Sequence, residues 1–141
     1  MKRIHMHISV DDLAKAIRYY TALLGAQPSV EKKDYAKWML DDPGLNLAVS
    51  LGCGKRGLSH LGVQVEDPRD LEGIRTRLAQ TAVGFEEESD AHCCYARSDK
   101  VWSRDPDGVV WESFLTHGSE RERDGDAGAI TKDVPVGSCC A

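Results

Sequence analysis

The sequence lacks long apolar runs, a surplus of positive charge and an even number of cysteines. Its 141 residues include 18 Lys and Arg against 23 Asp and Glu, a formal net charge of −5. This acidic balance argues against nucleic acid or an anionic membrane as the main partner. Apolar runs of only a few residues do not reach the length of a membrane span. The first residues also lack the apolar stretch of a signal peptide, so we expect a cytoplasmic protein.

The five cysteines are an odd number, which argues against a closed disulfide framework. Four of them form two adjacent pairs, and the full set is Cys53, Cys93, Cys94, Cys139 and Cys140. In a reducing compartment we expect free thiols. Adjacent cysteines rarely bridge each other, because the small ring strains the backbone and the disulfide torsion. We therefore interpret each pair as two neighbouring thiols that bind a common partner.

The chain contains the same pattern twice. Residues 4–10 alternate as a strand, and residues 13–24 carry apolar positions at helical spacing. Residues 60–67 repeat residues 5–12, and a second helix follows. Further strands are expected at 35–40, 45–51, around 85, and at 93–97, 100–104 and 109–116. We predict an α+β fold in which two paired βαβββ modules, about 3–51 and 58–116, form a cleft.

The composition changes after Thr116. Charge and glycine dominate residues 117–133, which cannot bury enough apolar surface to order themselves. We therefore predict one domain over residues 1–117 and a flexible tail over 118–141, which ends in Cys139-Cys140-Ala141.

Three positions predict a metal site. His5 and His60 occupy the same place in the two repeats, and Glu112 lies in the last strand of the second module. Two histidines and one carboxylate form a facial triad that leaves coordination positions open for substrate and oxygen. His7 competes with His5 because both lie on one face of the strand. The repeat register favours His5, and His7 then lines the pocket or supports a ligand.

These features resemble the vicinal oxygen chelate superfamily, whose glyoxalase-like members pair βαβββ modules and bind a metal at the positions of His5, His60 and Glu112. The resemblance covers nearly the whole chain to Thr116. Residues 93–102 (CCYARSDKVW), together with 105–108 (DPDG) and 111–112 (WE), are more specific. They resemble the ArsI organoarsenical carbon–arsenic lyases and their cadmium-induced CadI relatives. Residues 35–43 also fit, although close relatives often carry Gln where this chain has His5.

The resemblance implies an enzyme that uses Fe(II) and O2 to split trivalent organoarsenicals, such as methylarsenite, into inorganic arsenite and an organic fragment. Thiolates are soft ligands that suit arsenic. Cys93 and Cys94 can take its two exchangeable positions and leave the carbon facing the metal. Because neighbours in a strand point to opposite faces, both thiols converge only at a bulge or a strand end. The alternative is a buried strand pair used as small apolar residues.

Other roles stay open. Cys139 and Cys140 either capture arsenicals and pass them to the first pair, with the tail as tether, or form a dispensable end. Cys53 is either a third thiol over the cleft or a chance surface cysteine. For proton transfer the candidates are His7 and His92. The protein is expected to be a monomer or a homodimer.

The main alternative function is a non-catalytic cadmium- or arsenic-binding protein that uses the same thiols. A glyoxalase would need a second carboxylate ligand from the first module, and residues 48–50 offer none. A fosfomycin thiol transferase shares the triad but has no need of a cysteine pair. Most ring-cleaving extradiol dioxygenases are longer and carry a dedicated acid–base histidine.

Overall fold

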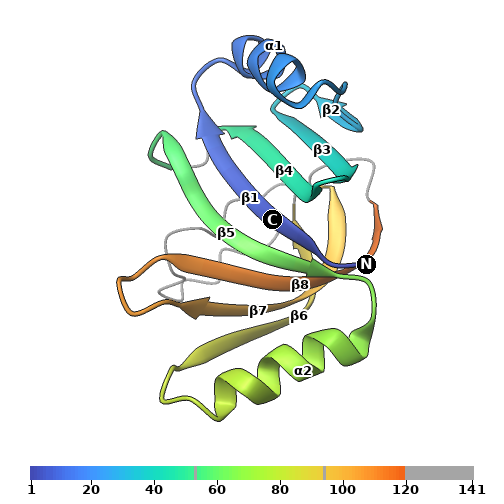
Figure 1. The fold of residues 1–141 in the computed structure, drawn as a ribbon. Coiled ribbons are helices and arrows are strands. Elements are labelled where there is room, and N and C mark those ends of the chain that lie inside the picture. Colours follow the sequence, from blue (N-terminus) through green and yellow to red (C-terminus); the bar gives the residue numbers. More distant parts are fainter. Residues whose placement is uncertain (53, 94, 120–141) are drawn as a thin grey trace.

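A computed structural model describes residues 1–52, 54–93 and 95–119. In this part of the chain the strands form one eight-stranded sheet, in the order β2-β3-β4-β1-β5-β8-β7-β6 (Figure 1). The elements are β1 (Arg3–Val10), α1 (Leu13–Leu24), β2 (Val30–Lys32), β3 (Tyr35–Asp41), β4 (Gly44–Leu51), β5 (Gly57–Val65), α2 (Pro68–Ala79), β6 (Phe85–Cys93), β7 (Ala96–Arg104) and β8 (Val110–Ser119).

The sheet consists of two equivalent halves, which confirms the predicted pair of βαβββ modules. β1 runs parallel to β4 in one half, and β5 runs parallel to β8 in the other. The antiparallel pairing of β1 with β5 joins the halves. The helix α1 packs against β3 and β4, and α2 packs against β5 and β8 (Figure 1). Neither helix has the length and apolar character needed to cross a membrane.

Local signals set the ends of α1. The Asp12 side chain caps its start by accepting a hydrogen bond from the Lys15 backbone N–H at 3.0 Å. Gly25 ends it in the left-handed region, with φ of 64°. The apolar side of α1 covers a core of Ala36, Trp38, Leu47 and Val49. Trp38 is therefore a packing residue of this core rather than part of the metal site.

The opposite face of the sheet, which we call the inner face, is polar and yet buried. Alternation along β1 turns His5, His7 and Ser9 to this face, and each is no more than 3% exposed. Met6 and Ile8 turn the other way and pack under α1. Burying polar groups is costly unless they find partners. A polar buried face in the centre of the sheet therefore points to function.

Two details differ from the sequence prediction. The strand expected over residues 93–97 is divided between two strands, because Cys93 ends β6, Ala96 begins β7 and Tyr95 before it takes a positive φ of 67°. The short edge strand β2 was not predicted. The predictions for Cys53, Cys94 and the tail from residue 120 lie outside the described residues.

Candidate metal centre

Three neighbouring strands bring His5, His60 and Glu112 together on the inner face. Their ligand atoms all lie within 4.8 Å of one another. His60 Nε2 lies 3.3 Å from His5 Nε2 and 3.1 Å from Glu112 Oε2. His5 Nε2 lies 3.6 Å from the same carboxylate oxygen. All three side chains are at most 1% exposed. One chain thus supplies a buried set of two nitrogens and one oxygen.

The contacts of the imidazoles favour the tautomer that a metal needs. His5 Nδ1 lies 3.0 Å from the backbone carbonyl of Asn46, so it carries the proton and donates it there. This leaves a lone pair on Nε2. His60 Nδ1 lies 3.2 Å from the Ser59 hydroxyl, which can accept its hydrogen bond when Nε2 binds a metal; without a metal, His60 Nε2 can instead carry the proton and donate to Glu112 Oε2. Burial lowers the pKa of His5 to about 4, so its imidazole is neutral near pH 7.

Gly62 lets the backbone come close at the centre. It pairs with His5 on one side and with Glu112 on the other. A Cβ at Gly62 would collide with the backbone carbonyl of Glu112 and would lie 3.3 Å from His5 Cδ2. Only glycine therefore allows β5 to run between the two ligands at this spacing.

Lys100 on β7 neutralises the carboxylate. Its Nζ lies 2.9 Å from Glu112 Oε1, and its side chain is only 3% exposed. Burial alone would raise the pKa of Glu112. The charge of Lys100, a hydrogen bond from His60 and the two imidazoles outweigh burial and lower this pKa to about 2. Glu112 is therefore ionised, as a metal ligand must be.

These residues fit a divalent metal. Two imidazole Nε2 atoms and an ionised carboxylate oxygen converge on one point, and each imidazole has a polar partner on its other nitrogen. A histidine that donates its second N–H to a backbone carbonyl is typical of metal ligands. Three protein ligands also leave positions open for other molecules.

Further side chains surround the triad. His7 Nε2 lies 3.0 Å from the Ser50 hydroxyl, and the His7 ring stacks on His60 with centroids 4.9 Å apart. Trp102 meets His60 edge to face at 5.3 Å. Phe114 meets His5 in the same way at 5.1 Å. His7 is thus placed beside the triad, while His5 lies in it, as the repeat register predicts.

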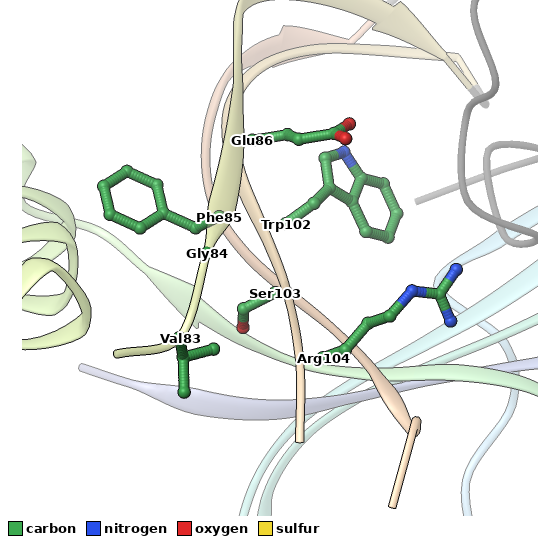
Figure 2. A pocket seen from close by; sticks show the side chains of 7 residues that line it. All are labelled: Val83, Gly84, Phe85, Glu86, Trp102, Ser103 and Arg104. Atoms are coloured by element: carbon green, nitrogen blue, oxygen red, sulfur yellow. The ribbon is translucent and has the colours of Figure 1, made fainter. Parts of the chain in front are cut away.

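Trp102 also lines the pocket in Figure 2, which has a volume of about 410 Å³. Its indole points to the same side of β7 as the Arg104 side chain, and Phe85 points away from both (Figure 2). The other lining residues are Val83, Gly84, Glu86 and Ser103. Trp102 is thus both a neighbour of His60 and a lining residue of this pocket.

The segment after Cys93 is anchored on the first module. The Tyr95 hydroxyl donates a hydrogen bond to Asp34 Oδ1 at 2.8 Å. Its ring lies 5.8 Å from that of Tyr35 and packs with Ala48. Ala48 is the partner of His7 across β4 and β1. The Tyr95 side chain thus packs on the inner face, against the register partner of His7.

The structure brings the predicted triad together and places His7 at its side. Cys93 is the last residue of β6; the other four cysteines lie outside the described residues. His92 is 42% exposed, and its Nε2 lies 3.7 Å from Asp90 Oδ2. Sequence reasoning missed Lys100 and the Asn46 carbonyl. Lys100 lies two residues before Trp102 in β7 and so on the same face of the sheet. Only the register of β7 with β8 shows that Lys100 faces Glu112.

Comparison with known proteins places the chain in a family. Residues 2–113 match the model of the Glyoxalase/Bleomycin resistance protein/Dioxygenase superfamily. The chain belongs to this superfamily. The metal triad lies within the matched residues.

The chain is also similar to individual proteins of known sequence or structure. The chain is 40% identical over 119 residues to a trivalent organoarsenical cleaving enzyme of Bacillus sp. strain MD1, covering 82% of this chain and 74% of the relative. It is 34% identical over 142 residues to the cadmium-induced protein CadI of Mycobacterium bovis, covering 99% and 93%. Homoprotocatechuate 2,3-dioxygenase of Brevibacterium fuscum has the same fold, with a TM-score of 0.60 and 22% identity over 86% of this chain and 38% of that chain.

Proposed function

We propose that this protein cleaves the carbon–arsenic bond of trivalent organoarsenicals such as methylarsenite, with Fe(II) on His5, His60 and Glu112 and with O2 as co-substrate. The observation that carries the proposal is a buried three-residue triad in a chain that also has two consecutive cysteines, the first of which ends β6. A relative at 40% identity is named for the same cleavage.

The position of Cys93 at the end of β6 supports the cysteine pair as the arsenic ligand. Cys93 ends a strand, where neighbouring side chains are not held to opposite faces as they are within a regular strand. Tyr95 ties the following backbone to Tyr35 and Ala48, beside His7 and the triad. Arsenic held by two thiolates keeps its third substituent, the carbon to be released, available to face the metal.

Bound Fe(II) would supply the redox chemistry that makes O2 reactive towards the arsenic-bearing carbon. The chain provides the conditions for it. The Asn46 carbonyl fixes the His5 tautomer, and Lys100 and His60 keep Glu112 ionised. The buried inner face keeps bulk water away from the ligands.

The thiols and the ferrous ion require a reducing compartment, so the cytoplasm remains our expected location. All three ligands come from one chain, so the proposed site needs no second subunit.

A second candidate is a protein that binds cadmium or arsenic without catalysis. The 34% identity to a cadmium-induced protein favours it specifically. The same two thiols would hold the ion, and no O2 would be consumed. The triad of His5, His60 and Glu112 would then have no function, and we therefore favour the enzyme.

The test is to incubate the reduced, Fe(II)-loaded protein with methylarsenite in air and to separate the arsenic species. We expect inorganic arsenite to form with the wild type. Cys93→Ser and Glu112→Ala should each lower the rate at least about 100-fold, because each removes a ligand that the reaction cannot replace.

Two matched variants control for general effects. Glu72→Ala removes an exposed carboxylate of α2, and Cys53→Ser removes a thiol outside the proposed pair. Both should keep the wild-type rate. The proposal fails if Cys93→Ser cleaves methylarsenite as fast as the wild type and Glu72→Ala do.

A further inference from the structure

The two oxygens of Glu112 have different neighbours. Oε2 faces the imidazoles, at 3.1 Å from His60 Nε2 and 3.6 Å from His5 Nε2. Oε1 forms an ion pair with Lys100, whose Nζ lies 2.9 Å away. A carboxylate can bind a metal through one oxygen or through both. The position of Lys100 therefore bears on how Glu112 binds a metal.

Lys100 is held firmly in this position. It lies in β7, where it pairs with Phe114 on β8 and Glu88 on β6. Its ammonium also lies 5.6 Å from the centre of the Trp102 ring, within the range of a cation–π contact. A lysine that is 97% buried beside the ring and the carboxylate has little freedom to leave Oε1.

We propose that Lys100 is a positioning residue that keeps Glu112 to a single metal bond, through Oε2. This inference rests on the proposed metal site and adds how that site stays open. With Oε1 held by Lys100, one coordination position remains for an incoming molecule that a two-oxygen carboxylate would fill.

The charge of Lys100 argues in the same direction. An ammonium group close to a divalent cation repels it, and the repulsion is strong in a buried site. A site built only to retain metal gains nothing from such a lysine. Lys100 thus lowers the affinity for the metal and keeps one coordination position open.

The test uses Mn²⁺ as a spectroscopic probe of the metal-free protein. Its binding is followed by the electron paramagnetic resonance of free Mn²⁺, and the bound water is counted by the proton relaxation of the solvent. Lys100→Met should bind Mn²⁺ at least about tenfold more tightly, because the repulsion is gone and the bound Mn²⁺ takes over from Lys100 in keeping Glu112 ionised. Its relaxation enhancement per bound ion should fall, because Oε1 replaces one water.

Lys37→Met is the matched control. Lys37 is also a lysine on the inner face, but it is only partly buried and lies on β3, opposite Ala48 of β4. It should leave both Mn²⁺ readings unchanged. Lys100→Gln separates charge from occupancy, since its amide can still donate to Oε1. It should tighten Mn²⁺ binding without changing the water relaxation.

A folded Lys100→Met protein with the wild-type relaxation enhancement per bound ion would overturn the proposal, whatever its affinity. If Lys100→Met fails to fold, Lys100→Leu takes its place, and an unchanged relaxation enhancement overturns the proposal in the same way. The assay contains no arsenical, so it is independent of the cleavage reaction. Wild-type protein that binds no Mn²⁺ would overturn the metal site itself, whereas bound metal without arsenite formation would overturn only the proposed function.

Discussion

Replacing Gly62 by alanine tests how closely the strands must approach at the metal centre. The added Cβ meets a backbone atom, the carbonyl of Glu112, so no side-chain rotation can relieve the clash. β5 and β8 must move apart where they carry His60 and Glu112. Overpacking of this kind costs about 1–3 kcal/mol of stability. A displacement near 1 Å at a reacting centre lowers activity by roughly 100-fold.

Two assays measure the loss of stability and the weakening of the metal site. Urea unfolding should give a lower midpoint with an unchanged slope, because stability falls while the surface exposed on unfolding stays the same. Mn²⁺ titration should show weaker binding. Gly84→Ala is the control, since no described heavy atom lies within 4 Å of its Cβ position. The reasoning is refuted if Gly62→Ala matches Gly84→Ala in both midpoint and metal affinity.

Three more predictions follow from the contacts around the site. Buried His5 has a pKa of about 4, so below pH 6.5 its imidazole takes up a proton in the unfolded state but not in the folded state. The free energy of unfolding of the metal-free protein should therefore fall by up to about 3 kcal/mol as the pH falls to 4. His5→Gln should flatten this dependence in urea unfolding at pH 7 and 4.5. Mn²⁺ at 100 times its Kd should stabilise the wild type by about 2.7 kcal/mol in thermal unfolding, and His60→Ala should abolish the gain. Tyr95→Phe loses the hydrogen bond to Asp34 and should cost about 1 kcal/mol of stability and raise KM for methylarsenite; an unchanged KM would count against the anchoring role of this tyrosine.

Much of the fold can be predicted from the sequence because the two modules repeat the same pattern. The shared pattern that begins at His5 and His60 predicts both modules and aligns two ligand positions independently of any structure. Alternation along β1 then places His5 and His7 on one face. The short strand Val30–Lys32 escapes prediction, because three residues give no alternation to detect and its pairing with β3 forms it.

The environment of the site is less accessible to sequence reasoning because it depends on strand order and register. Lys100 is 12 residues from Glu112 in the chain, and only the pairing of β7 with β8 brings their side chains together. The carbonyl of Asn46 has no sequence signature at all, since any residue supplies one. The sequence predicts a strand at Tyr95, where the structure has a turn. The positive φ of Tyr95 depends on tertiary contacts with Tyr35 and Asp34, which the local sequence does not indicate.

The most direct measurement is a single turnover that separates binding from cleavage. The reduced, Fe(II)-loaded protein is mixed anaerobically with one equivalent of methylarsenite, and inorganic arsenite is quantified before and after O2 is admitted. The proposed function predicts none before O2 and close to one equivalent after it, with no release from Glu112→Ala. Arsenite formed without O2, or bound methylarsenite that stays intact after O2, would contradict it.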